Sequence, residues 1–307
     1  MPLIIILIFT TLSLSLNVNA KIEPSAQDKV KAQVVAKNTI KTTNDDKEKW
    51  RKLDINKLVL MTLPHGKVVI ELAPQFSPKN VEQFVRLTKE KHYDGTKFYR
   101  VIDGFVAQAG PKEGSKEANS VPFLDLEGTW PTDKNWSFTL VQDNDLFAEK
   151  TGFKEGFAVA TNPSEDKAWL AHCPGIIAMG RENGPNTAAS HFYIPIGQAP
   201  RYLDRIMTIL GRVVYGMNHV QAITRTATIE NEPKVKEVDY TPIISMKMMT
   251  DVAKEQQIHL EVEDTENAIF ATKLVNRIKR KHPFFFQKPP PVLDVCQVPV
   301  LTRIVGK

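Results

Sequence analysis

The order of apolar and polar residues divides the middle of the chain into many short strands. Residues 58–63 and 67–72 are apolar runs separated by a Pro-His-Gly turn, the pattern of strand, turn and strand. Residues 98–110 form two further runs that meet at an Asp-Gly dipeptide, a strong signal for the tight turn of a β-hairpin. The pattern therefore predicts antiparallel sheet for most of this region.

The same pattern extends along the chain and includes little helix. Further strands are expected at residues 137–141, 157–160, 175–179, 191–194, 208–214 and 243–249. Helical spacing begins at Ser77-Pro78, where serine suits the N-cap and proline the first turn, and again at Gly216-Met217. Many short strands with only two helices predict a mainly β fold, an antiparallel barrel. Residues 111–172 are irregular, and we interpret them as a long loop or an insertion.

The N-terminal part differs from this strand-rich middle. Residues 1–20 carry no charged side chain and hold an apolar run over residues 3–16, short for a bilayer span of about 20 residues. We interpret residues 1–20 as a signal peptide cleaved after Ala20, with an uncleaved anchor as the alternative. Residues 21–55 are polar and without periodicity, which predicts a flexible leader before a folded domain over residues 56–250.

Residues 251–307 follow as a C-terminal extension. Residues 264–281 have acidic residues near their start and basic residues at their end, the polarity that suits a helix dipole. We interpret the basic cluster as a solvated helix end. Three prolines at residues 289–291 form a stiff spacer, and residues 292–305 are expected to form a closing strand docked on the barrel.

Composition narrows the class of protein. The 307 residues are 42% hydrophobic and 24% charged, as in globular proteins. A net charge of +5 is too small to indicate nucleic-acid binding, and none is expected. The two cysteines, Cys173 and Cys296, exclude a disulfide-rich scaffold and leave a single bridge open. The signal peptide predicts an exported, periplasmic protein of bacterial type, with no membrane span after cleavage.

Motifs for several common chemistries are missing from the chain. There is no Gly-x-Ser-x-Gly elbow, P-loop, dinucleotide fingerprint or His-Glu-x-x-His, so we expect neither a cofactor nor a metal. We interpret His172 as part of a loop rather than of a metal site. The hairpin at residues 98–110 instead carries Arg100, Phe105 and Gln108. A guanidinium, a ring and a carboxamide on one rigid unit can hold a peptide by its backbone and its side chain together.

Two later blocks place this hairpin in a wider pattern. Residues 174–194 contain Pro-Gly-Ile-Ile-Ala-Met-Gly-Arg, Gly-Pro-Asn-Thr and Ser-His-Phe-Tyr-Ile, and residues 202–213 contain Tyr-Leu-Asp and Gly-Arg-Val. With these three blocks in order, residues 56–250 resemble the cyclophilin family of peptidyl-prolyl cis-trans isomerases. The resemblance implies a cyclophilin-like eight-stranded antiparallel β-barrel capped by two helices. It also implies an isomerase that needs no cofactor and acts on proline-containing polypeptides in the folding of exported proteins.

The resemblance assigns roles to individual residues. Arg100 is the implied catalytic group, donating to the proline nitrogen when the amide twists, and Phe105 is the implied floor of the proline pocket. Gln108 would hydrogen-bond the substrate backbone. The other substrate-binding positions implied by the resemblance are Val106, Gly180, Arg181, His191, Tyr193, Tyr202, Leu203 and Met207.

Some positions depart from the common family pattern. His191 stands where Gln is usual, Met207 and Tyr99 where many members have His, Arg181 where Asn is the expected loop residue, and Tyr202 where eukaryotic members have Trp. These changes bear on substrate preference and turnover, and Tyr202 argues against strong cyclosporin binding. Two alternatives stay open: a non-catalytic or weakly catalytic module on the same fold that binds proline peptides or acts as a chaperone, and a C-terminal extension that docks a partner.

Overall fold

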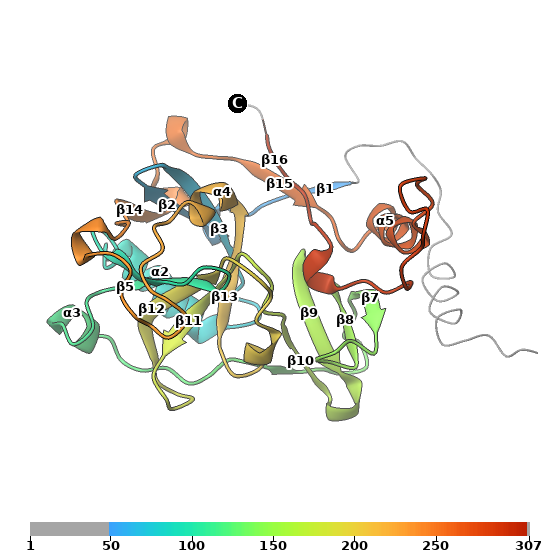
Figure 1. Ribbon diagram of the computed structural model, residues 1–307, viewed down its shortest axis with the longest axis horizontal. Coiled ribbons are helices and arrows are strands. Elements are labelled where there is room, and N and C mark those ends of the chain that lie inside the picture. The colour runs from blue at the N-terminus through green and yellow to red at the C-terminus, as the bar shows by residue number, and fades with distance from the viewer. Residues whose placement is uncertain (1–48, 306–307) are drawn as a thin grey trace, which may run out of the picture. The chain divides into compact units, whose positions relative to one another are not determined.

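The computed structural model of the chain describes residues 49–305, so the predicted signal peptide and most of the predicted leader lie outside the described residues. An eight-stranded antiparallel sheet dominates, in the order β14-β2-β3-β13-β11-β12-β5-β4 (Figure 1). Its strands are β2 (Leu58–Leu63), β3 (Gly66–Leu72), β4 (Lys97–Val101), β5 (Val106–Gly110), β11 (Ile176–Arg181), β12 (Ala188–Pro195), β13 (Ile209–Tyr215) and β14 (Ser245–Met248).

The sheet closes through the segment that leads into β14. The Phe98 amide donates to the Thr241 carbonyl at 3.0 Å, and the Ile243 amide donates to the Thr96 carbonyl at 2.8 Å. These bonds join the beginning of β4, at one edge of the sheet, to the chain entering β14 at the other edge. Backbone groups at both edges are thereby satisfied. The predicted eight-stranded antiparallel barrel is confirmed.

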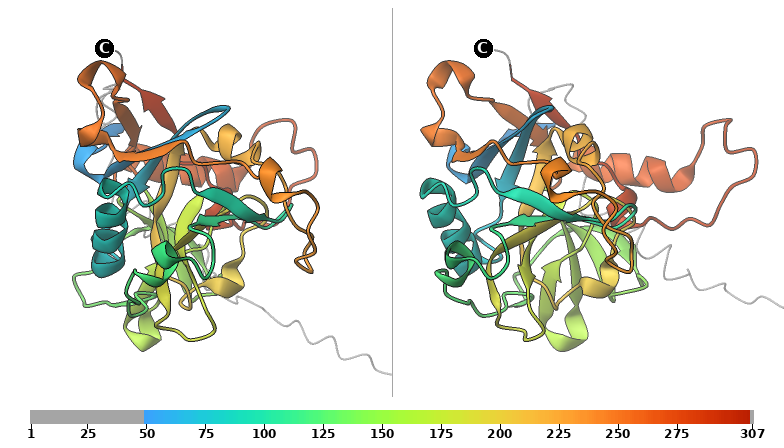
Figure 2. Two further views of the ribbon diagram at one scale, coloured as in Figure 1. Left: turned by 90° about the vertical axis from the view of Figure 1, so that its left-hand side faces the viewer. Right: turned by 60° about the vertical axis from the view of Figure 1, so that its left-hand side comes forward.

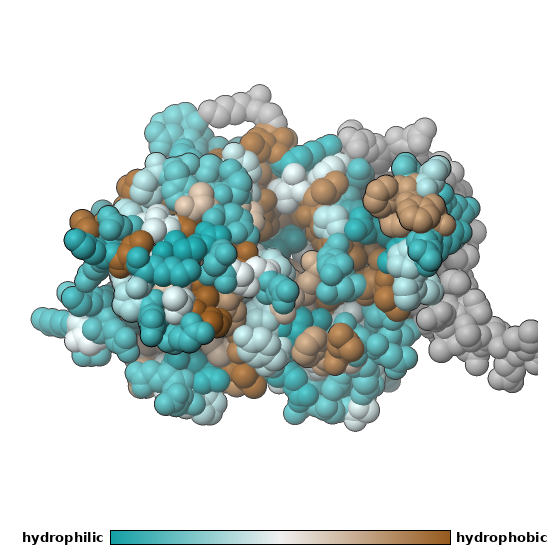
Figure 3. Space-filling model, in the orientation of Figure 1, coloured by the Kyte–Doolittle hydropathy of each residue, from teal (hydrophilic) through white to brown (hydrophobic). Residues whose placement is uncertain are grey.

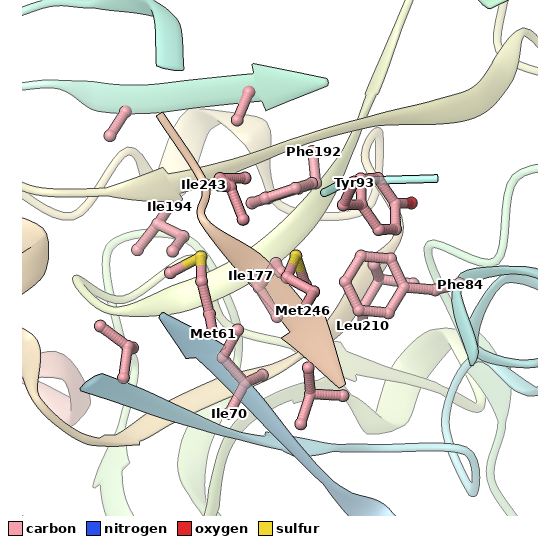
Figure 4. Close-up of a cluster of buried hydrophobic side chains, with 14 of the residues drawn as sticks. Met61, Ile70, Phe84, Tyr93, Ile177, Phe192, Ile194, Leu210, Ile243 and Met246 are labelled. Atoms are coloured by element: carbon pink, nitrogen blue, oxygen red, sulfur yellow. The ribbon is translucent and has the colours of Figure 1, made fainter. Parts of the chain in front are cut away.

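Two helices pack on the barrel, as predicted. Helix α2 (Pro78–Lys89) contributes Phe84 and two other apolar side chains to the buried core, and the short α4 (Met217–Gln221) contributes Val220. Figure 4 shows this core, with side chains from several strands and from α2 around one centre. The labelled residues are Met61, Ile70, Phe84, Tyr93, Ile177, Phe192, Ile194, Leu210, Ile243 and Met246.

Helix α2 begins at the predicted position, but its first amides are capped by Glu127 and not by the predicted N-cap Ser77. The Ser77 hydroxyl donates to the Ile209 carbonyl at 2.7 Å, so it fastens the helix to β13. The carboxylate of Glu127 accepts from the amides of Lys79 and Asn80 at 3.1 and 2.9 Å. A negative charge at these free amides also suits the helix dipole. Residue Glu127, from the interpreted insertion, thus completes a helix of the barrel.

Residues 111–172, predicted to be a long loop or an insertion, contain a sheet of their own. A short helix α3 (Lys116–Asn119) precedes a five-stranded antiparallel sheet in the order β6-β10-β9-β8-β7. Its strands are β6 (Trp130–Pro131), β7 (Thr139–Asp143), β8 (Lys150–Lys154), β9 (Phe157–Asn162) and β10 (Lys167–Leu170). The expected strands at residues 137–141 and 157–160 correspond to β7 and β9. The sequence pattern missed β8 because lysines stand at both ends of this short strand.

A three-stranded sheet brings together the two ends of the described chain. It consists of β1 (Trp50–Lys52), β15 (Leu260–Glu263) and β16 (Thr302–Ile304) in the order β1-β15-β16. Strand β1 lies within the predicted flexible leader, so ordered structure begins before residue 56. The Arg51 guanidinium donates to the buried Glu71 carboxylate of β3 at 3.0 Å, a contact that ties β1 to the barrel.

The C-terminal extension folds onto the barrel and the insertion. The predicted closing strand is limited to β16, and it pairs with β15 rather than with a barrel strand. The predicted helix is α5 (Ala268–Lys279), whose N-cap Asn267 accepts from the Phe270 amide.

A disulfide joins Cys173 to Cys296, so the single bridge that the sequence left open is present. None of the helices in the described part of the chain is long and apolar enough to cross a membrane.

Candidate functional site

A β-bulge in the hairpin places two consecutive side chains beside Gln108. In the register of β4 with β5, Phe98 pairs with Ala109 and Arg100 with Gln108, so Tyr99 is the extra residue. The buried Thr226 hydroxyl accepts from the Val101 amide at 2.7 Å and donates to the Tyr99 carbonyl at 3.0 Å. Bulges commonly redirect side chains at functional sites. Here the bulge brings both Tyr99 and Arg100 within reach of one carboxamide.

The Arg100 guanidinium is held in one orientation by three neighbours. Its Nε donates to Asn231 Oδ1 at 2.6 Å, and its Nη1 donates to Gln108 Oε1 at 3.4 Å. Its central carbon lies 5.7 Å from the centre of the Phe105 ring. Asn231 belongs to a loop that no sequence signal connected with the site. No carboxylate pairs with Arg100 among the described residues, so its charge remains available to a ligand.

Gln108 continues a chain of hydrogen bonds across the outer face of the barrel. Its Nε2 donates to the Tyr99 hydroxyl at 2.6 Å, and this hydroxyl lies 2.8 Å from His191 Nδ1. Burial raises the pKa of Tyr99 to about 12, which keeps the hydroxyl protonated. Since it already accepts from Gln108, Tyr99 can donate its proton to His191. The imidazole then carries its own proton on Nε2.

His191 fits between strands because its neighbours are glycines. A Cβ on Gly110 would lie 2.7 Å from His191 Nδ1, and Gly110 has a φ of +152°, which favours glycine. On the other side, Gly180 faces the His191 Cβ. Burial lowers the pKa of His191 below 6.5, the nearby Glu113 opposes this effect, and His92 adds to it. The imidazole is therefore neutral at pH 7.

The neutral His191 leads to a pH prediction. In the unfolded chain this imidazole takes up a proton near pH 6.5, whereas in the folded state it does so only at lower pH. The free energy of unfolding should therefore fall as the pH drops below 6.5. We expect a smaller fall for His191→Gln than for the wild type, measured by urea unfolding between pH 7 and pH 5. The exposed His259→Gln variant serves as the control and should follow the wild type; equal slopes for all three proteins would contradict the prediction.

Five of the predicted site residues line one cavity. It has a volume of about 500 Å³ and lies between the barrel and the start of the insertion. The predicted residues on its wall are Arg100, Gln108, Gly180, Arg181 and His191. The segment around α3 forms the opposite wall. A larger cavity of about 780 Å³, between the insertion and the C-terminal extension, contains none of the predicted site residues.

Five others form an apolar cluster, which the Arg100–Phe105 contact links to this cavity. Val106 and Tyr193 are buried, and Phe105, Leu203 and Met207 pack against them while remaining partly exposed. Such a surface suits a proline ring. Tyr202 does not join the cluster, because 64% of its side chain is exposed. A contact between Tyr202 and a substrate therefore stays a prediction.

Arg181 lines the cavity, but its guanidinium is turned toward the protein. Its Nε donates to the Ile206 carbonyl at 3.1 Å, and its Nη1 donates to the Glu182 carbonyl at 2.7 Å. These bonds brace the segment that carries Met207. The side chain therefore supports the site, and Arg181 is also paired with Ala188 of β12 through the sheet.

A buried polar network behind Tyr193 was not predicted. The Tyr193 hydroxyl lies 3.0 Å from His172 Nε2, and His172 Nδ1 lies 3.3 Å from Asp204 Oδ1. Asp204 also accepts from Trp169 Nε1 at 3.1 Å and from Arg201 Nε at 2.6 Å. Asp204 lies in the Tyr-Leu-Asp block and Tyr193 in the Ser-His-Phe-Tyr-Ile block, so two sequence signals marked parts of the network. The network fixes the tyrosine of the apolar cluster from behind.

No metal site is found in the region covered by the structure. Within residues 49–305, no group of three or more His, Cys, Asp or Glu side chains lies close enough to hold a metal ion. The arrangement supplies donors, an apolar surface and a cavity. It can bind an extended peptide and stabilise a lone pair beside Arg100.

Comparisons with known proteins place the barrel region in one family. A model of the family described as cyclophilin type peptidyl-prolyl cis-trans isomerase/CLD matches residues 58–247. A probable peptidyl-prolyl cis-trans isomerase from Brucella suis biovar 1 is 32% identical over 178 residues, which cover 58% of this chain and 76% of that protein. The isomerase ppi1 from Schizosaccharomyces pombe is 32% identical over 154 residues, which cover 50% of this chain and 76% of that protein.

A solved structure extends the match beyond the barrel. The crystal structure of cyclophilin AquaCyp293 from Hirschia baltica matches with a TM-score of 0.68 and 27% identity. The match covers 86% of this chain and 98% of that one, more of this chain than residues 58–247. Parts of the fold outside the family match thus have a counterpart there. With the barrel, the clustered site residues and these matches together, the chain belongs to the cyclophilin-type peptidyl-prolyl cis-trans isomerases, enzymes that accelerate rotation about the bond before proline.

Proposed function

We propose that this isomerase acts in the folding of exported proteins and that Arg100 is its catalytic residue. The observation that carries the proposal is the position of the Arg100 guanidinium, held by Gln108 and Asn231 between the apolar cluster and the cavity. A proline ring on the cluster would bring its nitrogen within reach of this donor. The cavity beside Arg100 would take residues on one side of the proline.

The reaction needs only that the twisted amide bind better than the planar one. Resonance gives the peptide bond partial double-bond character, and rotation faces a barrier of roughly 18–20 kcal/mol. When the bond twists, conjugation is lost and the proline nitrogen regains a lone pair. A guanidinium N–H that donates to this lone pair stabilises the twisted state selectively. Each ~1.4 kcal/mol gained only in that state accelerates rotation about tenfold.

The other residues hold the substrate in place for this step. Phe105, Leu203 and Met207 offer apolar surface to the proline ring, with Val106 and Tyr193 beneath them. Gln108 orients Arg100 and has a second oxygen lone pair for a substrate amide. Because Arg100 stands beside these groups, catalysis is favoured over the alternative of a module that only binds proline peptides.

Two features support export. Residues 1–20 have the composition of a signal peptide with a cleavage position after Ala20. The Cys173–Cys296 disulfide crosslinks positions 123 residues apart, and such bonds persist in oxidising compartments such as the bacterial periplasm.

One experiment tests export and isomerase activity together. The full chain is produced in a bacterial host, the periplasmic contents are released by osmotic shock, and isomerisation of an X-Pro peptide is followed in a protease-coupled assay. We expect the activity in the released fraction, on a chain that begins at Lys21. Active protein that stays in the cytoplasm would contradict export alone. Released protein without activity would contradict catalysis alone.

A further inference from the structure

Two aromatic side chains after α5 are largely exposed to solvent, although the Phe284 ring also contacts the edge of Phe285. The exposed fraction is 76% for Phe284 and 94% for Phe286. Figure 2 shows α5 and the loop that follows it extending away from the barrel. Figure 3 shows apolar side chains at the α5 end of the surface, surrounded by hydrophilic residues. Large exposed apolar groups in one place usually mark an interaction surface.

The loop is held in a defined conformation by its own contacts. The Arg280 guanidinium donates to the Pro290 carbonyl at 2.6 Å and to the Val292 carbonyl at 3.1 Å, which closes the base of the loop. At the tip, the Phe285 amide donates to the His282 carbonyl at 3.0 Å. Phe285 is half-buried and lines a hollow beside α5. The turn that buries this ring directs its two neighbours outward.

The sequence of α5 and the loop is basic. From Asn267 to Leu293 the sequence contains six Lys and Arg residues and no Asp or Glu. Lys279, Lys281 and Lys288 are exposed, and none of them has a carboxylate partner among the described residues. The whole chain has a net charge of only +5, so this segment concentrates positive charge around the two rings.

We propose that this loop binds the surface of an anionic phospholipid bilayer. Phe284 and Phe286 would enter the boundary between headgroups and acyl chains, while Lys279, Lys281 and Lys288 would lie against the headgroup phosphates. Binding of this kind grows with apolar area and with attraction between basic residues and anionic lipid. The tip of the loop projects two aromatic rings and is flanked by basic side chains. This arrangement fits the flat, negatively charged surface and apolar interior of a bilayer better than it fits the surface of a folded protein. The loop shares no residue with the cavity beside Arg100, so the proposal does not depend on the proposed function.

Co-sedimentation of the full chain with vesicles tests the proposal. We expect the protein to pellet with vesicles of phosphatidylcholine and phosphatidylglycerol, to stay in solution with phosphatidylcholine alone, and to be released by salt. The double variant Phe284→Ser/Phe286→Ser should lower vesicle affinity at least roughly tenfold. The triple variant Lys279→Gln/Lys281→Gln/Lys288→Gln should lower it by a similar factor.

Matched variants elsewhere on the surface test whether vesicle binding depends on this loop or on any exposed apolar or basic side chain. Leu146→Ser removes an apolar side chain that is also 94% exposed, and Lys134→Gln/Lys247→Gln/Lys254→Gln removes three other exposed lysines. Both should pellet like the wild type. Isomerase activity on a short peptide should be the same in all these proteins, which shows that they are folded. A wild-type protein that stays in solution with phosphatidylglycerol vesicles would overturn the proposal. So would loop variants that pellet as well as the wild type.

Discussion

Replacing Arg100 with alanine is expected to lower kcat/KM for an X-Pro peptide by roughly 10²–10³. Removal of a donor that acts only in the transition state typically has an effect of this size, which corresponds to about 3–4 kcal/mol. KM should change little, because the planar amide has no free lone pair on nitrogen for Arg100 to bind. The side chain is only partly buried and has no carboxylate partner among the described residues, so the variant should fold normally.

Two further variants decide how Arg100 acts. Arg100→Lys keeps the positive charge but loses the planar fork that lets one guanidinium contact Asn231, Gln108 and a ligand together. We expect it to recover only a small part of the activity. Arg86→Ala deletes an exposed guanidinium on α2, where it pairs with Glu90, and should leave kcat/KM unchanged. The protease-coupled assay measures all three proteins. Activity of Arg100→Ala equal to that of Arg86→Ala would remove Arg100 from the mechanism.

The hairpin shows how much of the site can be predicted from sequence. Its strands and its Asp-Gly turn follow from local pattern, and so does the presence of Arg100, Phe105 and Gln108 on one unit. The bulge at Tyr99 does not follow, because a single extra residue leaves the apolar pattern almost unchanged. Its free backbone groups are satisfied by Thr226, far along the chain. Local pattern therefore predicts the unit but not the direction of its side chains.

The features that local sequence pattern does not predict have a common physical origin. Tyr202 follows the family pattern in sequence, yet its exposure depends on how a short turn packs against residues distant in the chain. Strand β1 has too few apolar residues to be predicted, and it is ordered by pairing with β15 and by the contact of Arg51 with Glu71. The polar network behind Tyr193 unites residues from three separate segments. Tertiary contacts decide each of these cases, and a single sequence contains no periodic signal for them.

Replacing Asp204 with alanine is expected to lower the free energy of unfolding by about 3–5 kcal/mol, the usual loss when a buried ion pair is broken from one side. The Asp204 carboxylate accepts from Trp169 Nε1, from the His172 amide at 2.9 Å and from Arg201 Nε at 2.6 Å. Without it, the Arg201 guanidinium, 4% exposed, keeps only Asp145 at 3.2 Å as a carboxylate partner. The buried donors of Trp169 and His172 would be left unsatisfied.

The pH dependence of the stability lost in Asp204→Ala shows whether the loss comes from the carboxylate charge or from packing. Burial raises the pKa of Asp204, but the hydrogen bond from His172 and the charge of Arg201 outweigh it, so the pKa lies below 3.8. The carboxylate therefore stabilises the fold above pH 3.8, and this contribution is lost as the pH falls through the folded-state pKa. The difference between wild type and Asp204→Ala should stay constant near neutral pH and shrink only in that acidic range.

The same substitution links stability to the pocket. Once Asp204 is absent, His172 loses the partner that orients its ring, and the Tyr193 hydroxyl loses a fixed neighbour. When the assay is run below the melting temperature of the variant, we expect Asp204→Ala to have a higher KM than the wild type. Asp204→Asn keeps an oxygen acceptor and should lose less stability than Asp204→Ala. Asp103→Ala is the control, because its carboxylate is 72% exposed where it pairs with Arg225, and such pairs contribute less than about 1 kcal/mol. Urea unfolding of the oxidised proteins measures the difference. A loss for Asp204→Ala no larger than for Asp103→Ala would show that the network does not stabilise the fold behind the proline surface.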